Sequence, residues 1–439
     1  MINRRVVAAL VLVAVPLAVV AAAYGGSSGT SSKAAPGVNT AVKGKISISG
    51  VWTGDEQKNF QAVLDGFKKK YPNVSVKYNP TGDNTPTVLS TAVQGGNPPD
   101  LASVSQPGLV SDFAKRGALK PLTFAKGTIG KNYPADIAKL GVINGKLYGL
   151  IFKGANKSTV WYNVKAFKNA GIAAPKTWPQ FLKDAKTLKA SGTDAYSIGG
   201  ADGWTLTDLF ENIYLRQAGP TKYDQLTTHK IKWTDPSVKA ALKTMAAVLG
   251  DTSNIAGGTS GALQTDFPTS VSNVFSLKPK AAQVIEGDFV PGVVASSTKL
   301  KAGSGYNVFA FPAIGSTANY VEGGGDEMMA FKDSPAIRAL VKYLATGDAQ
   351  SIWAKRGGYS APAKTVPASA YPDKITRTTA TAIGQAKVFR FDLSDLQPAS
   401  FGGTVGQGEF KIFQDFLKNP SNVNGIAQEL ESAAAKAYK

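Results

Sequence analysis

Three neighbouring segments of the chain decide its fold: ISISGVW at 46–52, TGDEQKNFQAVLDGFKKKYPNVSVKY at 53–78 and GGNPPDLASVS at 95–105. The middle segment predicts a helix with one buried face, because its large apolar residues recur at helical spacing: Phe60, Val63, Leu64, Phe67 and Tyr71. Thr53 and Glu56 form a T-x-x-E capping box at its start, and Pro72 ends it.

Apolar, β-rich runs flank that helix and predict strands. Residues 46–51 and 74–78 are two such runs, and the helix between them is a crossover long enough for the strands to be parallel. A second helix fits 85–94, and 101–104 supplies a third strand. This order predicts the opening of a doubly wound α/β domain. In such a sheet the loops after the first and third strands open on one edge, where ligands bind.

The bulk composition describes an ordered, basic protein without a nucleic-acid signature. With 439 residues, 43% of them hydrophobic, the chain suggests two or three domain-sized units with real cores. Its 49 Lys and Arg against 30 Asp and Glu give a net charge of +19. The lysines are scattered and no Arg-rich basic patch occurs, so we interpret the charge as a solvated surface rather than as nucleic-acid binding.

The N-terminal 23 residues predict export. Arg4 and Arg5 precede an apolar run from Val6 to Ala23 that closes in small residues, which is the pattern of a secretory signal peptide. The alternative is a membrane anchor, since the run is near the minimum length that spans a bilayer. A flexible Gly/Ser/Ala-rich linker is expected at 24–44.

The residue types that common enzyme chemistry needs are nearly absent. The chain has no Cys and a single His, His229 in a polar stretch, which argues against Ser-His-Asp or Cys-His catalysis and against His or Cys zinc sites. No GK[ST] phosphate loop and no calcium-binding loop pattern occurs, so neither a cofactor nor a metal is predicted. A secreted glycosidase needs only two carboxylates, and 30 acidic residues leave that alternative open.

The rest of the chain continues the α/β pattern, and a second α/β unit begins near residue 157. Strands are expected at STVWYN (158–163), SIGG (197–200), QVIEG (283–287) and YNVFAF (306–311). Helices are expected after Thr177 and over 205–218, 236–249, 335–344, 409–418 and 424–437.

The ordered set of segments from residue 45 to 439 resembles the bacterial solute-binding proteins of carbohydrate ABC importers, the family that includes the maltose-binding proteins. The segments that carry this resemblance are GFKKKYPNVSVKY (66–78), GGNPPDL (95–101), STVWYN (158–163), KTWPQFLKDA (176–185), AAQVIEGDFV (281–290) and YNVFAFPAIG (306–315). Two more look most like the branch that takes up α-glucosides and related oligosaccharides, namely GGGDEMMAFKDSPAIRALVKYLATGDAQSIWAKRGGYSAP (323–362) and FDLSDLQPASFGG (391–403).

The resemblance implies a two-lobed periplasmic-binding-protein-like fold, in which two doubly wound α/β lobes are joined by a hinge and close on a ligand cleft. On that template the first lobe is 45–156 plus 322–366, and the second is 157–321 plus 367–439. The family implies a binding protein rather than an enzyme. It would capture a sugar, an oligosaccharide or an α-glucoside, and deliver it to the membrane permease subunits of an ABC importer.

The resemblance also bears on location. We expect an exported monomer at the cell surface or in the extracellular or periplasmic space. Related exported binding proteins usually carry a lipidated Cys where Tyr24 stands, and a thioether cannot form without the thiol. A lipid anchor at this site is therefore not expected, whereas ordinary cleavage after the Ala-rich end of the signal is.

Sugar recognition needs flat apolar surfaces for the pyranose rings and fixed polar groups for the hydroxyls, which aromatics beside acids or amides supply. Trp52, Asp55 and Glu56 follow the first strand, in a loop that family members use for hydroxyl contacts. In the alternative, Trp52 packs under the helix and the two acids merely favour its N-terminus. Trp204 stands where the resemblance implies a ring-stacking aromatic.

Two more segments supply candidate binding residues. Phe289 matches a position where the family often has Trp, and Asp288 stands beside it; a core Phe is the alternative. The run from Gly323 through Gly324 to Asp326 lies at the expected lobe crossing. Its glycines have the φ freedom of a hinge, and Asp326 is expected to accept two sugar hydroxyls; a plain turn is the alternative.

Three isolated residues complete the set. Gln106, after the third strand, and Arg356, after a predicted helix that carries Trp353, are expected hydroxyl partners, and Phe401 is a further aromatic candidate. The same fold with a non-sugar solute remains an alternative. An iron site usually needs Tyr, His and carboxylates together, and the chain has one His. A polyamine site needs an acid-lined cleft, which is not expected in a chain with so few acids.

Overall fold

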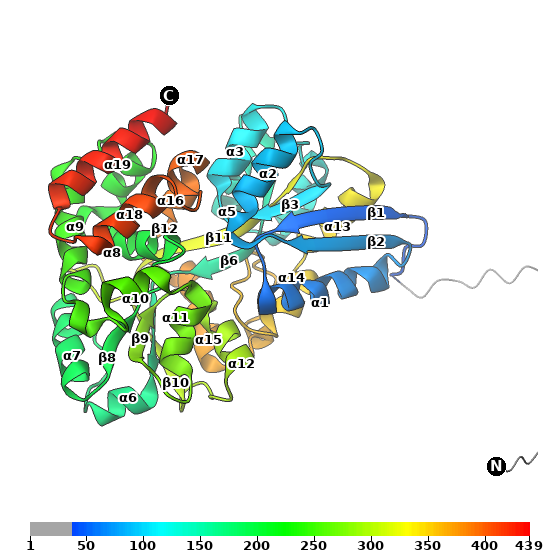
Figure 1. Ribbon diagram of the computed structural model, residues 1–439. Coiled ribbons are helices and arrows are strands. Elements are labelled where there is room, and N and C mark those ends of the chain that lie inside the picture. Colours follow the sequence, from blue (N-terminus) through cyan, green and yellow to red (C-terminus); the bar gives the residue numbers. More distant parts are fainter. Residues whose placement is uncertain (1–36) are drawn as a thin grey trace, which may run out of the picture. The chain divides into compact units, whose positions relative to one another are not determined.

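A computed structural model of the chain describes residues 37–439, so the predicted signal peptide and most of the predicted linker, Tyr24 included, lie outside the described residues. From Val38 to Lys439 the larger strands collect in two sheets, and each sheet is the centre of one lobe (Figure 1). Within residues 37–439 no helix has the length and apolar character needed to cross a membrane.

The first lobe is built on a six-stranded sheet whose opening confirms the predicted one. β1 (Gly44–Gly50) lies parallel to both β2 (Val74–Pro80) and β3 (Leu101–Val104). The order β12-β11-β3-β1-β2 continues the sheet, and β6 also pairs with β11. These further strands are β6 (Gly149–Asn156), β11 (Tyr320–Ala330) and β12 (Val388–Phe391).

Helices cover this sheet. They are α1 (Gly54–Lys70), α2 (Thr85–Gln94), α3 (Pro107–Lys115), α4 (Lys126–Asn132), α5 (Ala135–Leu140), α13 (Pro335–Leu344) and α14 (Gly347–Ala354). A small hairpin of β4 (Val142–Ile143) and β5 (Lys146–Leu147) precedes β6. Asn144 and Gly145 at its tip both have positive φ, as a tight two-residue hairpin turn requires.

The second lobe is built on a four-stranded sheet in the order β10-β7-β9-β8. Its strands are β7 (Thr159–Asn163), β8 (Asp194–Ser197), β9 (Ala281–Ile285) and β10 (Tyr306–Ala310). Its helices are α6 (Val164–Asn169), α7 (Trp178–Ala190), α8 (Trp204–Thr227), α9 (Pro236–Leu249), α10 (Gly258–Gln264), α11 (Phe267–Phe275), α12 (Val290–Ser297), α15 (Lys374–Gln385), α16 (Leu393–Leu396), α17 (Ala399–Gly402), α18 (Gly408–Lys418) and α19 (Val423–Ala437).

One predicted element has different limits: the strand expected at 197–200 lies at Asp194–Ser197. The helix expected over 205–218 is confirmed as the first part of α8, because the backbone at Gly219 is not helical, with φ 79° and ψ 167°. Gly219 adopts that conformation readily, and a second helix begins at Pro220 and ends at Thr227.

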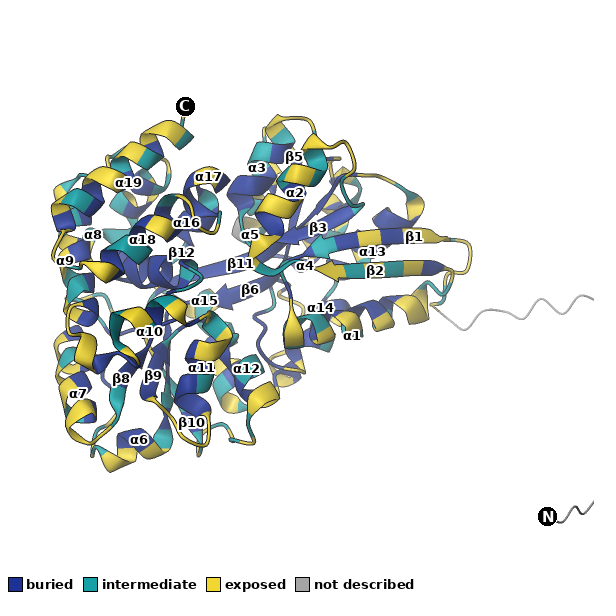
Figure 2. Cartoon of the chain, in the orientation of Figure 1, coloured by how far each residue is buried: buried dark blue, intermediate teal, exposed yellow. Residues whose placement is uncertain are grey.

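Each lobe has its own hydrophobic core. Figure 2 shows β3, β6, β9 and β11 buried, whereas β2 at the edge of the first sheet is largely exposed. In α1 the predicted face is buried, with Phe60, Val63 and Phe67 fully covered. Thr53 is the N-cap of α1, but its side chain makes no capping hydrogen bond. The predicted capping box is therefore wrong, because the carboxylate of Glu56 instead pairs with Lys153.

Strands connect the two lobes. β6 ends at Asn156 and β7 of the second sheet begins at Thr159, while β11 pairs with β12 over its first four residues and with β6 over most of its length. The sheet of the first lobe thus includes β12, which lies beyond the segments expected for that lobe. The limits of the lobes given above remain a prediction.

Candidate ligand-binding cleft

A cavity of about 320 Å³ lies between the two lobes. The loops after β1, β2 and β3 line it from the first lobe, at the predicted ligand edge of the sheet. The second lobe contributes the starts of α8, α11 and α16 and the turn before α12. The floor consists of β6 and β11 where they pass between the lobes. Ligand pockets typically measure about 300–1,000 Å³, so this cavity can hold a small molecule.

Asp326 is the anchored acid of the first-lobe wall. Its Oδ2 accepts a 2.6 Å hydrogen bond from the indole Nε1 of Trp52, and its Oδ1 accepts one of 2.8 Å from Ser105. The ammonium of Lys153 lies 3.4 Å from Asp326 Oδ2 and 3.1 Å from Glu56 Oε1. The two carboxylates are therefore held in place before any ligand arrives.

The second-lobe wall is aromatic. The ring of Trp204 lies 5.4 Å from that of Phe267 and 6.1 Å from that of Phe289, centroid to centroid. Gly203 directs Trp204 into this position, since its φ of 84° starts α8 and a Cβ there would lie 2.6 Å from Cβ of Phe410. Trp204 is half-buried, which leaves part of its ring open to the cavity.

One hydrogen bond spans the cavity. The indole Nε1 of Trp204 donates to Oδ2 of Asp83, in the turn after β2 of the first lobe, over 3.3 Å. Since the two residues belong to opposite lobes, this contact exists only when the walls approach each other. The structure is therefore that of a cleft whose walls touch at this point.

Two buried lysines lie on the floor of the cleft, and Lys153 contacts both walls. Lys153 lies 5.2 Å from the centroid of the Phe289 ring, and Lys157 lies 5.6 Å from that of Trp204. Lys157 also pairs with Asp208, at 3.0 Å, and with Asp392. Burial alone would lower the pKa of both ammonium groups, but the surrounding carboxylates raise each pKa above its usual value. Both lysines are thus charged at neutral pH.

The cleft is rich in acids although the protein is basic. Its lining combines two lysines, Lys153 and Lys157, with seven acids: Glu56, Asp83, Asp202, Asp266, Asp326, Asp392 and Asp395. Burial and the neighbouring charges of Asp83 and Asp266 raise the pKa of Asp202 to about 7. The composition argument made above against an acid-lined cleft therefore fails, because the acids are concentrated at this one place.

The sequence profile of the bacterial extracellular solute-binding proteins matches residues 52–351 of the chain. The chain belongs to this family. It is 32% identical to an osmoprotective compounds-binding protein of Synechocystis sp., over 85% of this chain and 89% of that protein. It is 30% identical to an alpha-glucosides-binding periplasmic protein of Rhizobium meliloti, over 87% and 85% respectively.

The fold of this solute-binding protein is shared by solved structures. A chitin oligosaccharide binding protein superposes with a TM-score of 0.77 at 21% sequence identity, covering 90% of this chain and 99% of that one. A bacterial solute receptor described as preferring β-D-galactopyranose gives 0.78 at 20% identity, covering 91% and 100%. The predicted family and the predicted two-lobed fold are confirmed.

The solute-binding protein brings five of the residues predicted from sequence together at the cavity: Glu56, Gln106, Trp204, Phe289 and Asp326. The other six do not line it: Trp52, Asp55, Asp288, Gly324, Arg356 and Phe401.

Trp52 and Phe401 are core residues. Trp52 is completely buried, with ring centroids 4.6 Å from Phe60 and 5.2 Å from Trp353. It packs against the helix, as the alternative interpretation held, and reaches the cavity only through its hydrogen bond to Asp326. Phe401 is buried in the core of the second lobe, 5.5 Å from Trp233. Neither ring is available to stack on a sugar.

The polar candidates outside the cavity already have partners. Asp288 is buried and accepts a hydrogen bond from Ser360. Arg356 donates from Nε to Asn59 over 2.5 Å, and Asp55 forms a 2.9 Å ion pair with Lys58 one turn further along α1. Their partners hold these side chains in place outside the cavity.

The glycine run serves close packing rather than φ freedom. Gly323, Gly324 and Gly325 are regular strand residues of β11, and none has a positive φ. A Cβ at Gly325 would lie 2.7 Å from the carbonyl oxygen of Lys153, and one at Gly324 would lie 3.0 Å from Cε of Lys157. The run lets β6 and β11 approach each other and leaves space for both lysines.

The two floor lysines are the main residues that the sequence analysis missed. Both lie in the run GLIFKGANKSTVWYN (149–163), where Lys153 follows four apolar residues of β6 and Lys157 lies between β6 and β7. A charged residue in such a run signals either an edge or a buried ion pair. Asp83 and Phe267 were missed as well, and no comparable sequence pattern marks them.

Proposed function

We propose that this solute-binding protein captures a carbohydrate between its lobes and delivers it to the permease subunits of an ABC importer, without catalysing a reaction. The observation that supports this best is the pairing of two chemistries in one cavity. The half-buried ring of Trp204 lies on one wall, and the anchored carboxylates of Asp326 and Glu56 lie on the other.

The proposed binding mode follows from these groups. The C–H face of a pyranose ring would lie on Trp204, and its hydroxyls would bond to Asp326, Glu56 and Gln106. Trp52, Ser105 and Lys153 hold the acids in advance, so little ordering is needed on binding. The names of the two relatives, for α-glucosides and for osmoprotective compounds, agree with a polyhydroxylated or other small polar solute.

The proposal includes the location and state of the protein. We expect an exported monomer, at the cell surface or in the extracellular or periplasmic space, in keeping with the extracellular family. Because Tyr24 stands where a lipidated Cys is usual, we expect no lipid at that position. The mass of the mature protein distinguishes cleavage after Ala23 from retention of the whole N-terminal run.

The test is a calorimetric panel on the full mature chain. We expect one or more of α-linked and β-linked glucosides, maltooligosaccharides, trehalose and xylosides to bind with a Kd of about 1 μM, which corresponds to about −8 kcal/mol. Trp204→Ala should weaken that binding by about tenfold or more, whereas Trp204→Phe, which keeps an aromatic face, should lose less. Closure on the sugar should also quench or shift tryptophan fluorescence.

Two results would contradict the proposal. Binding by no member of the panel would exclude the carbohydrate ligand and turn attention to a cationic solute, for which the seven cleft acids are suited. Hydrolysis of any member, detected as released reducing sugar, would favour an enzyme.

A further inference from the structure

Folding gathers acids in the interior of this protein and leaves its surface more basic than the composition indicates. Among residues 37–439, eleven Asp and Glu side chains are buried, but only three basic ones are: Lys153, Lys157 and Arg216. The whole chain already has a net charge of +19. Because more acids than bases are buried, the surface carries a larger positive excess than the chain as a whole.

Three segments bring exposed lysines together at one end of the first lobe. β1 and β2 start at this end and α1 ends there, on the side of the lobe away from the second lobe (Figure 1). The backbone N–H of Asn39 donates to the carbonyl oxygen of Lys70 over 2.8 Å. Lys45 of β1 lies opposite Ser75 of β2. The lysines of this basic end are Lys43, Lys45, Lys68, Lys69, Lys70 and Lys77.

Few acids neutralise the basic end. None of its six lysines forms an ion pair within the described range 37–439, and Lys68 donates only to backbone carbonyls. Asp100 lies beside β1, but it already pairs with Lys332 over 3.0 Å. Asp65, exposed on α1 one turn before the lysines, adds a single negative charge. The basic end therefore keeps a strong positive excess.

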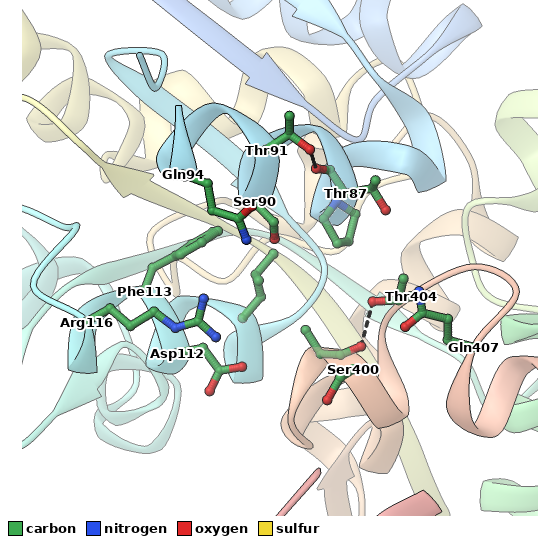
Figure 3. A pocket seen from close by; sticks show the side chains of 13 residues that line it. Thr87, Ser90, Thr91, Gln94, Asp112, Phe113, Arg116, Ser400, Thr404 and Gln407 are labelled. Atoms are coloured by element: carbon green, nitrogen blue, oxygen red, sulfur yellow. Dashed lines mark hydrogen bonds between the residues drawn. The ribbon is translucent and has the colours of Figure 1, made fainter. Parts of the chain in front are cut away.

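The charges around the two cavities are different. A second cavity of about 310 Å³, between α2, α3 and residues 399–407, has one charged residue of each sign in its lining, Asp112 and Arg116 (Figure 3). The cleft is rich in acids, as described above. β1 leads from Gly44 at the basic end to Gly50 beside the cleft, so the basic end and the cleft lie at opposite edges of the first sheet.

The basic end is also where the N-terminal part of the chain joins the first lobe. Residues 38–43 lead into β1 beside the end of α1. Fourteen residues, 24–37, separate the predicted apolar run from Val38 in the sequence. Whatever holds the N-terminus of the exported protein therefore holds the chain at the basic end.

We propose that the basic end binds the anionic phospholipid headgroups of a membrane surface and so retains the exported protein there without a lipid anchor. Clusters of about four to eight basic residues are attracted by the negative surface potential of such membranes. All six residues are lysines, which act as point charges and not as the planar forks that bind one phosphate in a fixed geometry. A charged surface therefore suits them better than a single phosphate ligand.

This mode of attachment leaves the cleft free. Because the basic end and the cleft lie at opposite edges of the sheet, a protein bound by its lysines keeps the cleft away from the headgroups. The inference concerns attachment and does not depend on which solute the cleft binds.

The test is cosedimentation with phospholipid vesicles. It uses the mature chain that begins at Tyr24, so that the predicted apolar run cannot itself insert into the bilayer. One set of vesicles contains phosphatidylglycerol and phosphatidylcholine in equal parts, and the other contains phosphatidylcholine alone. The fraction of bound protein is measured against lipid concentration, at low and at high salt.

Two triple variants with the same change in net charge show where the binding lies. The first replaces half of the lysines of the basic end by Gln: K45Q, K69Q and K70Q. The matched control replaces three exposed lysines of α6 and α7 in the second lobe, which form no ion pair within the described part of the chain: K165Q, K168Q and K186Q. Circular dichroism melting confirms that both variants are folded.

We expect the mature chain to bind the anionic vesicles and not the neutral ones, and to bind less at high salt because salt screens exposed charges. The basic-end variant should bind the anionic vesicles about tenfold more weakly or worse, and the control should stay within about twofold.

Three results would overturn the inference and leave the proposed sugar capture untouched: no binding to the anionic vesicles, equal binding to the neutral ones, or equal weakening by the two triple variants. A fourth result would replace the partner. If a soluble polymer of glycerol phosphate binds the mature chain and the vesicles do not, the membrane surface is excluded.

Discussion

The two walls of the cleft differ in how each uses a tryptophan, Trp52 in the first lobe and Trp204 in the second. Each follows a strand at the ligand edge of its lobe, yet Trp52 is completely buried and Trp204 is half-exposed to the cavity. The rings of Phe60, Phe152 and Trp353 surround Trp52, whereas Trp204 begins α8 beside Phe267 and Phe289. The same residue type thus supports the wall in one lobe and forms its surface in the other.

The consequence is a division of roles between the walls. The first lobe presents polar groups to the cavity, with its aromatic cluster behind them, and Trp52 contributes through the hydrogen bond that orients Asp326. The second lobe presents the rings themselves. A sugar needs both surfaces at once, so the cavity is functional only when the lobes come together.

The largest expected effect is a difference in the free energy of unfolding between variants of the two tryptophans. Trp52→Ala should lower the free energy of unfolding by about 3–5 kcal/mol, because it leaves a void among packed rings and removes the hydrogen bond from the indole Nε1 to Asp326. Trp204→Ala should cost about 1 kcal/mol or less, since its ring is only half-buried. Urea unfolding followed by circular dichroism measures both, and equal losses would contradict the contrast between the walls.

An intermediate effect is expected at the floor, where β6 and β11 are closest. Gly325→Ala should cost about 1–3 kcal/mol, because the added Cβ would lie 2.7 Å from the Lys153 carbonyl and must push β6 aside. Gly130→Ala is the control, since a Cβ there meets nothing within 4 Å and α4 gains a better helix former. If thermal melting shows the two variants to be equally stable, the close approach of the strands is not what these glycines serve.

A pH dependence of stability is also expected from Glu327 in the first lobe. Glu327 follows Asp326 on β11 but is completely buried, with no partner for either carboxylate oxygen among residues 37–439, and burial raises its pKa to about 8. Its folded pKa lies above the unfolded one, so the folded state is favoured at low pH and loses stability as pH rises from about 4.5 towards 8.

Glu327→Gln removes that titration. The free energy of unfolding of the variant, measured against the unaltered protein, should improve by about 1 kcal/mol or more between pH 5 and pH 8.5. Glu429→Gln is the control, because Glu429 is exposed on α19 and should produce no such trend. A difference that does not change with pH would show that Glu327 is solvated or paired in the folded protein.

Much of the fold could be predicted from local pattern. The helical spacing from Phe60 to Phe67, the Gly-bounded run at 85–94 and the apolar run at 101–104 predict α1, α2 and β3 correctly, because burial of one face imposes a periodicity that is visible in sequence. The predicted helices at 236–249 and 335–344 agree with α9 and α13 to the residue for the same reason.

The site was less predictable, and particular residues show why. Glu56 was expected to cap its own helix, but the charge of Lys153, almost a hundred positions away in sequence, binds its carboxylate instead. Asp288 and Phe401 stand in segments typical of the family, yet a partner on another element, Ser360 or Trp233, decides that each faces inward. The role of Lys157 depends on Asp208 and Asp392, which are distant in sequence and pair with its ammonium group in the folded protein.

The sequence by itself determined the class of protein: two α/β units, a ligand edge after the first strands, and the family of extracellular solute-binding proteins. These depend on periodicity, turns and ordered motifs, which are local properties of the chain. The tertiary structure alone decided which side chains meet in the cleft, because facing Trp204 with Asp83 or Lys153 with Asp326 requires strands that cross between lobes. No local rule describes such pairs, since the energy that selects them arises only when distant segments pack.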